Sequence, residues 1–547
     1  MPAALQAERA SMKNQWITRV ECAVAILLSI AVLFLLFVRA THAGALWRDE
    51  AESVQIARMP QFTEVLQYLR YSSFPVLFPV ILRTYTTLFG VSDVSLRYFG
   101  LTVGICFLGV AWLHSRSVTR EFPLLLPALI GLNANFLTAG TSVRGYGIGS
   151  VLSLLAFTFS ARLVLQPSRR LMLGVFLAGL ASMQCLFHNA AIIPAIVLAA
   201  AAVFLVRGEL KWMGLLLFTA ALCGGLAHLT KLLNTYFATD WGKVLAVPFS
   251  FTAFLHQFIA ACGEAHLSVS VVWLSVVLLS VMVAVWRLAV VREIKHARER
   301  EMLLFGVIAL SVSLFLHYAL FGRINEPQER YFLALTCLVA IATDLIVANF
   351  CCYYWIRVAR ISLVVVAIFA MPIAIWPKII KRQTNIDIVA AEVSKGARPD
   401  DLVVVNPWYF GISFGRYYGG QAKWLMLPQI AERRFHRYDL LHAKMASELP
   451  VADVFDAVRA TLLRGNRVWI VGGTIVPSVD SPEGLELPPA PRSEFGWNAK
   501  AYYSLWSQQL YYLVRDNCTE GRIVLDRMPG VDDVENVLLW LAEGQSR

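Results

Sequence analysis

The stretch Ala45-Leu-Trp-Arg-Asp-Glu-Ala-Glu-Ser53 follows the first long apolar run of the chain. It places an Arg-Asp-Glu triplet at the expected edge of a membrane. Ionisable residues at that depth are costly to hold near hydrocarbon, and they are usually kept for chemistry, for substrate contact or for pairing with one another. The carboxylates of Asp49 and Glu50 are therefore the first candidates for a functional site.

The composition around this stretch is typical of a membrane protein. Of the 547 residues, 58% are hydrophobic and 16% are charged, and the mean hydropathy is +0.60. Globular chains average about 45–50% apolar and about 25% charged residues. The net charge of +11 comes from basic residues in short loops between apolar runs, which indicates membrane topology and excludes a nucleic-acid groove.

Apolar runs long enough to cross a bilayer, about 20 residues each, recur before residue 380 and predict about eleven spans. The first follows Lys13 and Arg19 without a convincing cleavage site, so we expect an uncleaved span and not a signal peptide. The predicted spans are 22–40, 99–114, 122–139, 147–165, 171–187, 190–206, 213–229, 267–290, 302–320, 331–350 and 361–377.

Basic residues between these spans lie on one side, which the positive-inside rule assigns to the cytoplasm. An odd number of spans then places the N-terminus inside and the C-terminus outside. We expect the membrane to be the inner (plasma) membrane. Lys378, Lys381 and Arg382, after the last span, depart from the rule. The residues that define the inner side are Lys13, Arg19, Arg116, Arg120, Arg169, Arg170, Arg207, Lys211, Arg292, Lys295, Arg298, Arg300, Arg357 and Arg360.

The same pattern divides the chain into a multi-span domain over 1–379 and an extracytoplasmic domain over 380–547. In the first outer loop, 62–71 and 76–89 have helical spacing and are expected to lie in the membrane interface. The tail alternates short buried runs with helical segments, which predicts a small α/β domain with a partly parallel sheet. Its predicted strands are 402–405, 468–471 and 522–525, and its predicted helices are 385–396, 451–464, 501–514 and 531–543.

Polar residues of the membrane region gather at the extracytoplasmic ends of the predicted spans. A secondary transporter usually holds its coupling residues near the midplane, on broken and repeated helices. An enzyme that acts on a lipid headgroup concentrates charge at one face instead, so this distribution favours an enzyme. The gathered residues are Asp49, Glu50, Arg97, Arg144, His188, Asn189, His228, Lys231, Arg323, Glu326, Glu329 and Arg330.

Several of these residues also have a purely structural interpretation. Asp49 could be a helix N-cap, with Glu52 completing a capping box. Arg144 and Arg330 could extend to lipid headgroups. His188 is of a type that packs more often than it ligates, and no His or Cys spacing typical of a metal site is present. No cofactor is therefore predicted, and a divalent metal has no ligand motif to support it.

Four motifs in order resemble those of the integral-membrane GT-C glycosyltransferases, which include the protein O-mannosyltransferases and the lipid A aminoarabinose transferases. They cover roughly the first 380 residues, and their ordered combination is more specific than any one alone. One element departs from the family, because Tyr71-Ser-Ser-Phe-Pro-Val76 stands where many relatives have His-Pro-Pro or acidic-x-Pro-Pro. That difference argues against aminoarabinose transfer to lipid A. The motifs are Leu46-Trp-Arg-Asp-Glu-Ala51, Phe89-Gly-Val-Ser-Asp-Val-Ser-Leu-Arg97, Ser142-Val-Arg-Gly-Tyr146 and Glu329-Arg-Tyr-Phe332.

The resemblance implies transfer of a sugar from a polyprenyl phosphate to an extracytoplasmic hydroxyl of a glycan, lipid or protein. Asp49 is then the expected general base, and Glu50 is expected to orient it or the acceptor. A direct displacement with one base should invert the anomeric carbon. Arg144 and Arg330 are expected to bind the donor phosphate through paired hydrogen bonds, and Lys231 is expected to add a charge.

Tyr146, His188 and Tyr331 are expected to line the substrate cavity. A second function class stays open, namely a non-catalytic handler of lipid-linked glycans such as a flippase, a transporter or a polysaccharide-assembly subunit. Only the enzyme should lose product formation when Asp49 is replaced by Asn.

Overall fold

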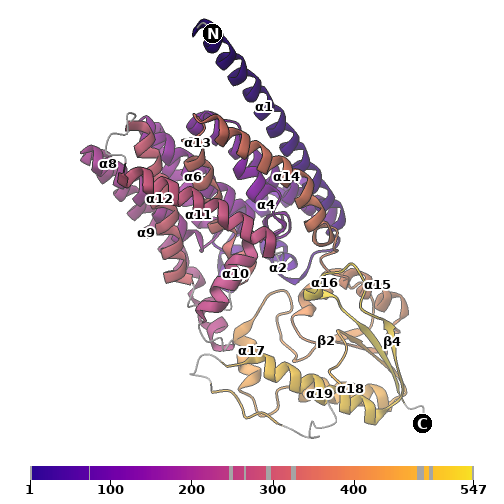
Figure 1. Cartoon of the computed structure of the whole chain (residues 1–547). Coiled ribbons are helices and arrows are strands. Elements are labelled where there is room, and N and C mark those ends of the chain that lie inside the picture. The colour runs from indigo at the N-terminus through magenta and orange to yellow at the C-terminus, as the bar shows by residue number, and fades with distance from the viewer. Residues whose placement is uncertain are drawn as a thin grey trace.

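The structure is a computed structural model, which describes residues 3–72, 74–244, 250–263, 267–290, 297–321, 328–476, 486–491 and 497–544, without the side chains of 3–14, 231–242, 267, 290 and 321. Long helices form a bundle in the N-terminal part, and the described strands all lie in the C-terminal part (Figure 1). The chain is thus a helical membrane-type protein with a small C-terminal α/β region, as the sequence predicts.

Within the described residues, nine helices are long and apolar enough to cross a membrane. Eight of them contain a predicted span, and α13 lies within the predicted span 331–350. About 20 consecutive apolar residues satisfy their backbone groups in a bilayer by forming a helix. These helices are α1 (Ala3–His42), α5 (Asp93–His114), α6 (Gly145–Leu165), α8 (Asn189–Arg207), α9 (Leu210–Val244), α11 (Leu267–Val290), α12 (Ala297–Phe321), α13 (Leu333–Ala348) and α14 (Tyr354–Ile379).

Neither of the remaining two predicted spans forms a helix as long as these nine. The first, 122–139, contains two five-residue helical segments, Pro127–Gly131 and Phe136–Gly140. Pro127 cannot donate a backbone hydrogen bond. The side-chain Oδ1 of Asn133 accepts the N–H of Asn135 at 2.8 Å, so this N–H does not take part in a helical hydrogen bond. The second forms α7 (Arg169–Cys185), a helix of 17 residues.

The broken segment 122–139 nevertheless runs the length of the bundle. Arg120 before it lines a cavity with Arg162, near the end of α6. Ser142 after it lines a different cavity with Arg144, at the start of α6. The prediction of a membrane segment here is therefore compatible with the fold, although the prediction of a continuous helix is wrong.

The first loop folds as three short helices, α2 (Arg48–Ala57), α3 (Phe62–Tyr68) and α4 (Leu77–Phe89). The last two match the predicted interfacial helices. Trp47 is the N-cap of α2, and Asp49 is its second residue, so the alternative that Asp49 and Glu52 form a capping box is wrong. A capping box is formed instead at α3, by Gln61 and Glu64.

A five-stranded sheet in the order β2-β1-β3-β5-β4 forms the centre of the C-terminal region. Strand β1 pairs in parallel with β2 and β3, whereas β5 is antiparallel to β3 and β4. Three of the strands match the predictions, and β2 was missed. The strands are β1 (Leu402–Val405), β2 (Lys423–Met426), β3 (Arg467–Val471), β4 (Cys518–Leu525) and β5 (Leu539–Gly544).

The predicted helix over 531–543 is wrong, because this segment contains a 3-10 turn (Asp533–Glu535) and most of β5. Leu539 and Leu541 are buried and Trp540 between them is half-buried, which is the alternation of a strand. Pairing with β3 and β4 on both sides outweighs the local helical periodicity. The helices of this region are α15 (Ile386–Gly396), α16 (Phe410–Tyr417), α17 (Tyr438–Met445), α18 (Ala452–Leu463) and α19 (Ala499–Asn517).

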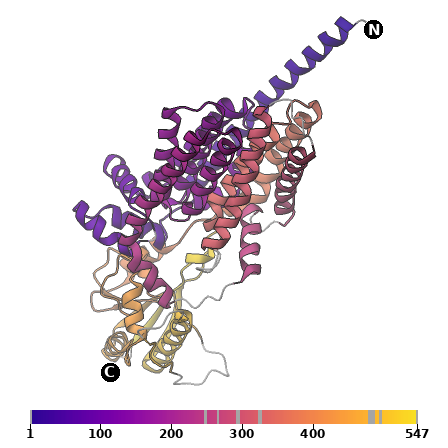
Figure 2. The same cartoon turned by 90° about the vertical axis from the view of Figure 1, so that its left-hand side faces the viewer.

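The C-terminal region packs on one end of the helical bundle (Figures 1 and 2), and α2 lies at the junction (Figure 1). Helix α2 contacts α16, and α9 contacts α17. Tyr417 of α16 joins the two parts, because its hydroxyl donates to Asp93 Oδ2 at 2.9 Å and accepts the N–H of Leu46 at 2.7 Å. The hydroxyl of Tyr417 therefore links the beginning of the first loop, at Leu46, to its end, at Asp93.

Candidate functional site

Asp49 lies in the first turn of α2, and its carboxylate faces four basic side chains. Its oxygens are 3.5 Å from Arg144 Nη2, 3.8 Å from His436 Nε2, 3.9 Å from Arg330 Nη2 and 3.9 Å from Arg48 Nε. Burial by itself would raise the pKa of Asp49, but these charges outweigh it and lower the pKa to about 2. Asp49 is therefore an anion at neutral pH, and the positive charges around it stabilise this form.

Arg144 reaches Asp49 because glycines let the chain turn tightly before α6. A Cβ on Gly145 would lie 2.3 Å from the carbonyl oxygen of Cys185, and one on Gly147 would lie 1.7 Å from that of Gly140. The buried guanidinium of Arg144 donates through Nη1 to the backbone oxygen of Asp49 at 2.7 Å and to Ser53 Oγ at 3.3 Å. Two contacts with the same helix fix its direction.

Glu50, the neighbour of Asp49, points elsewhere. Its fully buried carboxylate accepts two hydrogen bonds from Arg97 Nη1, at 2.8 and 3.0 Å, and one from the N–H of Val143 at 2.9 Å. Arg97 also donates to the backbone oxygens of Gly44 and Ala45. Glu50 therefore ties α2 to α5 and to the residue before Arg144, and it lines neither of the cavities described next.

Two cavities meet at the site. The first, of about 350 Å³, is lined by the cations Arg39 and Lys378 together with Glu329 and Asp532. The second, of about 210 Å³, is lined by Asp49. Arg144 and Arg330 line both cavities. The two predicted phosphate-binding residues therefore lie at the boundary between them. The other residues common to both are Tyr146 and Gln328.

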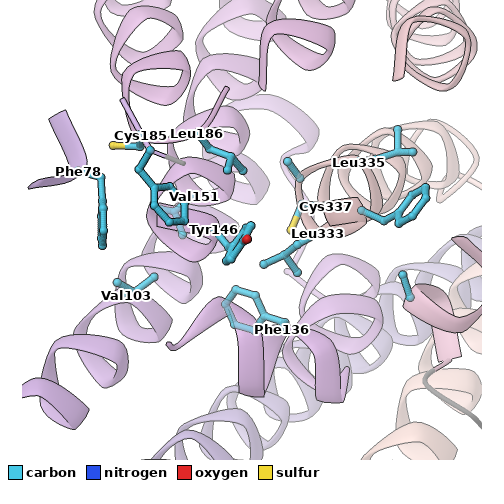
Figure 3. Close-up of a cluster of buried hydrophobic side chains, with 14 of the residues drawn as sticks. Phe78, Val103, Phe136, Tyr146, Val151, Cys185, Leu186, Leu333, Leu335 and Cys337 are labelled. Atoms are coloured by element: carbon cyan, nitrogen blue, oxygen red, sulfur yellow. The ribbon is translucent and has the colours of Figure 1, made fainter. Parts of the chain in front are cut away.

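The three residues that were predicted to line the cavity form a continuous aromatic wall of the second cavity. The ring of Tyr331 stacks on His188 at a centroid distance of 5.2 Å, and it lies 6.2 Å from the ring of Tyr146. Tyr146 is set among buried side chains that include Phe136 and Leu333 (Figure 3). The packing of its ring in this apolar cluster helps to fix the adjacent Arg144.

Arg330 comes from the 3-10 turn that precedes α13, and its guanidinium lies over the rings of Trp47, at 5.3 Å, and Tyr331, at 5.5 Å. It is a quarter exposed, more than Arg144. Lys231 belongs to α9, but its side chain, like Arg323 and Glu326 as a whole, lies outside the described residues.

Sequence reasoning missed the residues that the C-terminal region adds to this site. His436 precedes α17 and lines the second cavity with Tyr438. Its Nδ1 is 3.0 Å from Glu52 Oε2, and its backbone N–H donates to Glu52 Oε1 at 2.9 Å. The run Arg433-Arg-Phe-His-Arg-Tyr438 is unusually polar for its surroundings, but no spacing in the sequence links it to Asp49. In the described part of the chain, no group of three or more His, Cys, Asp and Glu side chains could hold a metal ion.

No protein-family model and no curated protein matches this sequence. Among solved structures, apo ArnT from Cupriavidus metallidurans is similar with a TM-score of 0.53 and 12% identity, over 82% of this chain and 92% of that one. ArnT bound to undecaprenyl phosphate matches with a TM-score of 0.48, 13% identity and the same coverage.

The Archaeoglobus fulgidus oligosaccharyltransferase in complex with zinc and sulfate matches with a TM-score of 0.48 and 11% identity, over 91% of this chain and 78% of that one. ArnT is a lipid A aminoarabinose transferase, and both proteins are GT-C membrane glycosyltransferases. The likeness to apo ArnT extends through the helical bundle and into the C-terminal region, since it covers more residues than the bundle contains. This chain therefore has the fold of the GT-C membrane glycosyltransferases.

Proposed function

We propose that this protein is a membrane glycosyltransferase that moves a sugar from a polyprenyl phosphate to an extracytoplasmic hydroxyl of a glycan, lipid or protein, with inversion at the anomeric carbon. The observation that carries the proposal is the ionised Asp49 carboxylate, placed beside Arg144 and Arg330 where a basic cavity meets a second cavity. The fold supports the same reaction class.

The donor phosphate binds, in this proposal, at Arg144 and Arg330 on the side of the first cavity. A sugar phosphate ester that breaks at the anomeric carbon releases a phosphate, which needs charge stabilisation more than protonation. Guanidinium groups in a partly dehydrated cleft supply that stabilisation, and Arg39 and Lys378 add positive charge nearby.

The acceptor hydroxyl occupies the second cavity and gives its proton to Asp49 as its oxygen attacks the sugar carbon. In the free protein Asp49 is a weak base, because Arg144 and Arg330 hold its pKa low. A bound phosphate competes for both guanidinium groups and neutralises part of their charge, so it should raise the proton affinity of Asp49. Donor binding would then activate the base only when the sugar is in place.

Replacing Asp49 by Asn tests the proposal, because Asn keeps the shape but cannot take the proton. We expect the rate of sugar transfer from a panel of polyprenyl-phosphate hexoses and pentoses to hydroxyl acceptors of the cell envelope, added with the donors, to fall by about 10²–10⁴-fold. Asp516→Asn is the matched control, since Asp516 is exposed on α19 and lines no described cavity near the site. A wild-type protein that binds these donors without releasing sugar would instead indicate a non-catalytic glycan handler.

A further inference from the structure

Among the described residues, His436 carries the one imidazole within 4.0 Å of the Asp49 carboxylate, and it comes from the C-terminal region. Its side chain is 8% exposed, its Nδ1 is 3.0 Å from Glu52, and its Nε2 is 3.8 Å from Asp49 Oδ1. Glu52, itself 4% exposed, also accepts the backbone N–H of His436. The imidazole therefore stands between two carboxylates of α2, one on each ring nitrogen.

The residues around His436 keep the ring in this position. Phe435 packs in a small cluster with residues of the first loop and lies 5.1 Å from the ring of Tyr68. The guanidinium of Arg437 lies 4.4 Å from the centroid of Tyr71. Tyr438 stacks on the imidazole itself at 5.8 Å. Phe435 and Arg437, on either side of His436, thus fix this segment against the first loop, and Tyr438 packs on the imidazole.

We propose that His436 is a catalytic residue that receives the acceptor proton by way of Asp49, and that Glu52 is its positioning residue. This inference rests on the glycosyl transfer proposed above, and it makes the C-terminal domain a part of the active site.

Glu52 selects the tautomer that this role requires. A carboxylate at Nδ1 favours the form with hydrogen on Nδ1, which leaves a lone pair on Nε2 directed toward Asp49. In serine hydrolases a carboxylate on one ring nitrogen likewise orients an imidazole base, although there the other nitrogen faces the nucleophile and not a second carboxylate. Here the imidazole gives the proton taken up by Asp49 a second acceptor, so Asp49 does not have to retain it.

The proposed step balances as follows. The acceptor oxygen forms a bond to the sugar carbon while the bond from that carbon to the phosphate oxygen breaks, and the bonding electron pair leaves with the phosphate. The hydroxyl proton passes to Asp49 and then to His436 Nε2, giving an imidazolium between the carboxylates of Asp49 and Glu52. The distance of 3.8 Å between Asp49 Oδ1 and His436 Nε2 is longer than a hydrogen bond. Asp49 therefore has to move toward His436 when phosphate draws Arg144 and Arg330 away.

Several charged groups line the same cavity as His436. From α2 these are Asp49, Glu52 and Arg48. Arg144 precedes α6, Arg330 precedes α13, and both line the same cavity as His436. Tyr438 of α17 faces it as an uncharged ring, because burial raises the pKa of its hydroxyl.

The experiment compares His436→Asn with His436→Gln in the full-length protein, with the same donor panel. Asn offers an amide N–H near the position of Nδ1, so it preserves the bond to Glu52 but has no group at Nε2. A structural role would therefore be rescued by Asn. We expect both variants to release sugar at least about 10²-fold more slowly than wild type, with unchanged affinity for undecaprenyl phosphate. His42→Asn, at an exposed histidine of α1 that lines none of the cavities described, is the control.

The split between kcat and KM distinguishes proton transfer from positioning of the substrate. We expect His436→Asn to lower kcat with an unchanged KM for the donor, and Glu52→Gln, which keeps an acceptor for the imidazole, to lower kcat less than His436→Asn does. Wild-type kcat in His436→Asn, or a loss confined to KM, would overturn the inference alone. A wild-type protein without sugar release would overturn the proposed function itself.

Discussion

At the residue scale, the site depends on the shape of the arginine side chains as well as on their charge. Arg144 uses two nitrogens, one for the backbone oxygen of Asp49 and Ser53 Oγ and the other for the Asp49 carboxylate. A lysine has one charged nitrogen and cannot make both sets of contacts. The guanidinium therefore links the helix, the carboxylate and the proposed phosphate.

Arg144→Lys and Arg330→Lys should each reduce the transferase rate with a polyprenyl-phosphate sugar by about tenfold or more, and Arg144→Lys should have the larger effect because its contacts are buried. Arg515→Lys on α19 is the control, since Arg515 is half-exposed and pairs with its neighbour Asp516. If both active-site variants matched wild type, the arginines would instead be anchors to lipid headgroups.

A second residue-scale prediction concerns competition for the arginines. Asp49 and a bound phosphate need the same two guanidinium groups, so removal of the Asp49 charge should strengthen phosphate binding. Asp49→Asn should bind undecaprenyl phosphate several-fold more tightly than wild type, in line with the loss of one competing charge near two cations. Calorimetric or fluorescence titration in detergent measures this, and weaker binding by the variant would place the phosphate elsewhere.

At the scale of elements, Glu50 holds α2 against α5 and the segment before α6. The pair Glu50–Arg97 is fully enclosed, and each partner has additional hydrogen bonds to the backbone. The prediction that Glu50 orients Asp49 or the acceptor stays a prediction. The contacts support an indirect form of it, in which Glu50 sets the separation of Asp49 and Arg144.

Glu50→Gln should destabilise the protein by about 3–5 kcal/mol, because it leaves the buried charge of Arg97 without its partner. The double variant Glu50→Gln with Arg97→Met should recover part of that loss, since no buried charge remains. Thermal unfolding in detergent measures both. Equal unfolding temperatures of wild type and the single variant would mean that the pair does not support α2.

At the scale of the whole molecule, the basic residues at the end of α14 and just after it have ion-pair partners, which accounts for their departure from the positive-inside rule. Lys378 is 3.4 Å from Glu329, Lys381 is 4.0 Å from Asp533, and Arg382 donates to Asp387. These residues serve ion pairs where the bundle meets the C-terminal region. The division at about residue 380 into a membrane domain and an extracytoplasmic domain is proposed on this basis.

We predict that the N-terminus is cytoplasmic and the C-terminal domain extracytoplasmic, in an inner (plasma) membrane. Arg298 lines a basic cavity with Arg116, Arg162 and Arg207, at the ends of helices remote from Asp49. A reporter fused at Arg298 should therefore signal from the cytoplasm and one fused after Arg547 from the other side. A cytoplasmic signal from the C-terminal fusion would remove Asp49 from the outer face.

The sequence by itself determined the features that follow from local chemistry and from the thickness of a bilayer. Apolar runs located the membrane helices, and two of the three helices of the first loop, α3 and α4, were predicted from their periodicity. The ends of the spans placed Asp49, Arg144 and Arg330 on one face. The strands β1 and β3 were predicted because central parallel strands are buried on both faces and have continuous apolar runs.

Only the tertiary structure decided the contacts between distant segments. Glu52 and His436 are 384 residues apart, and neither residue carries a local pattern that names its partner. Strand β5 forms because β3 and β4 pair with it, which its own helix-like periodicity opposes. The direction of Glu50, away from the cavity that Asp49 lines, depends on Arg97 and Val143. Such features depend on which groups the fold brings together, and side-chain periodicity describes only which face of an element is buried.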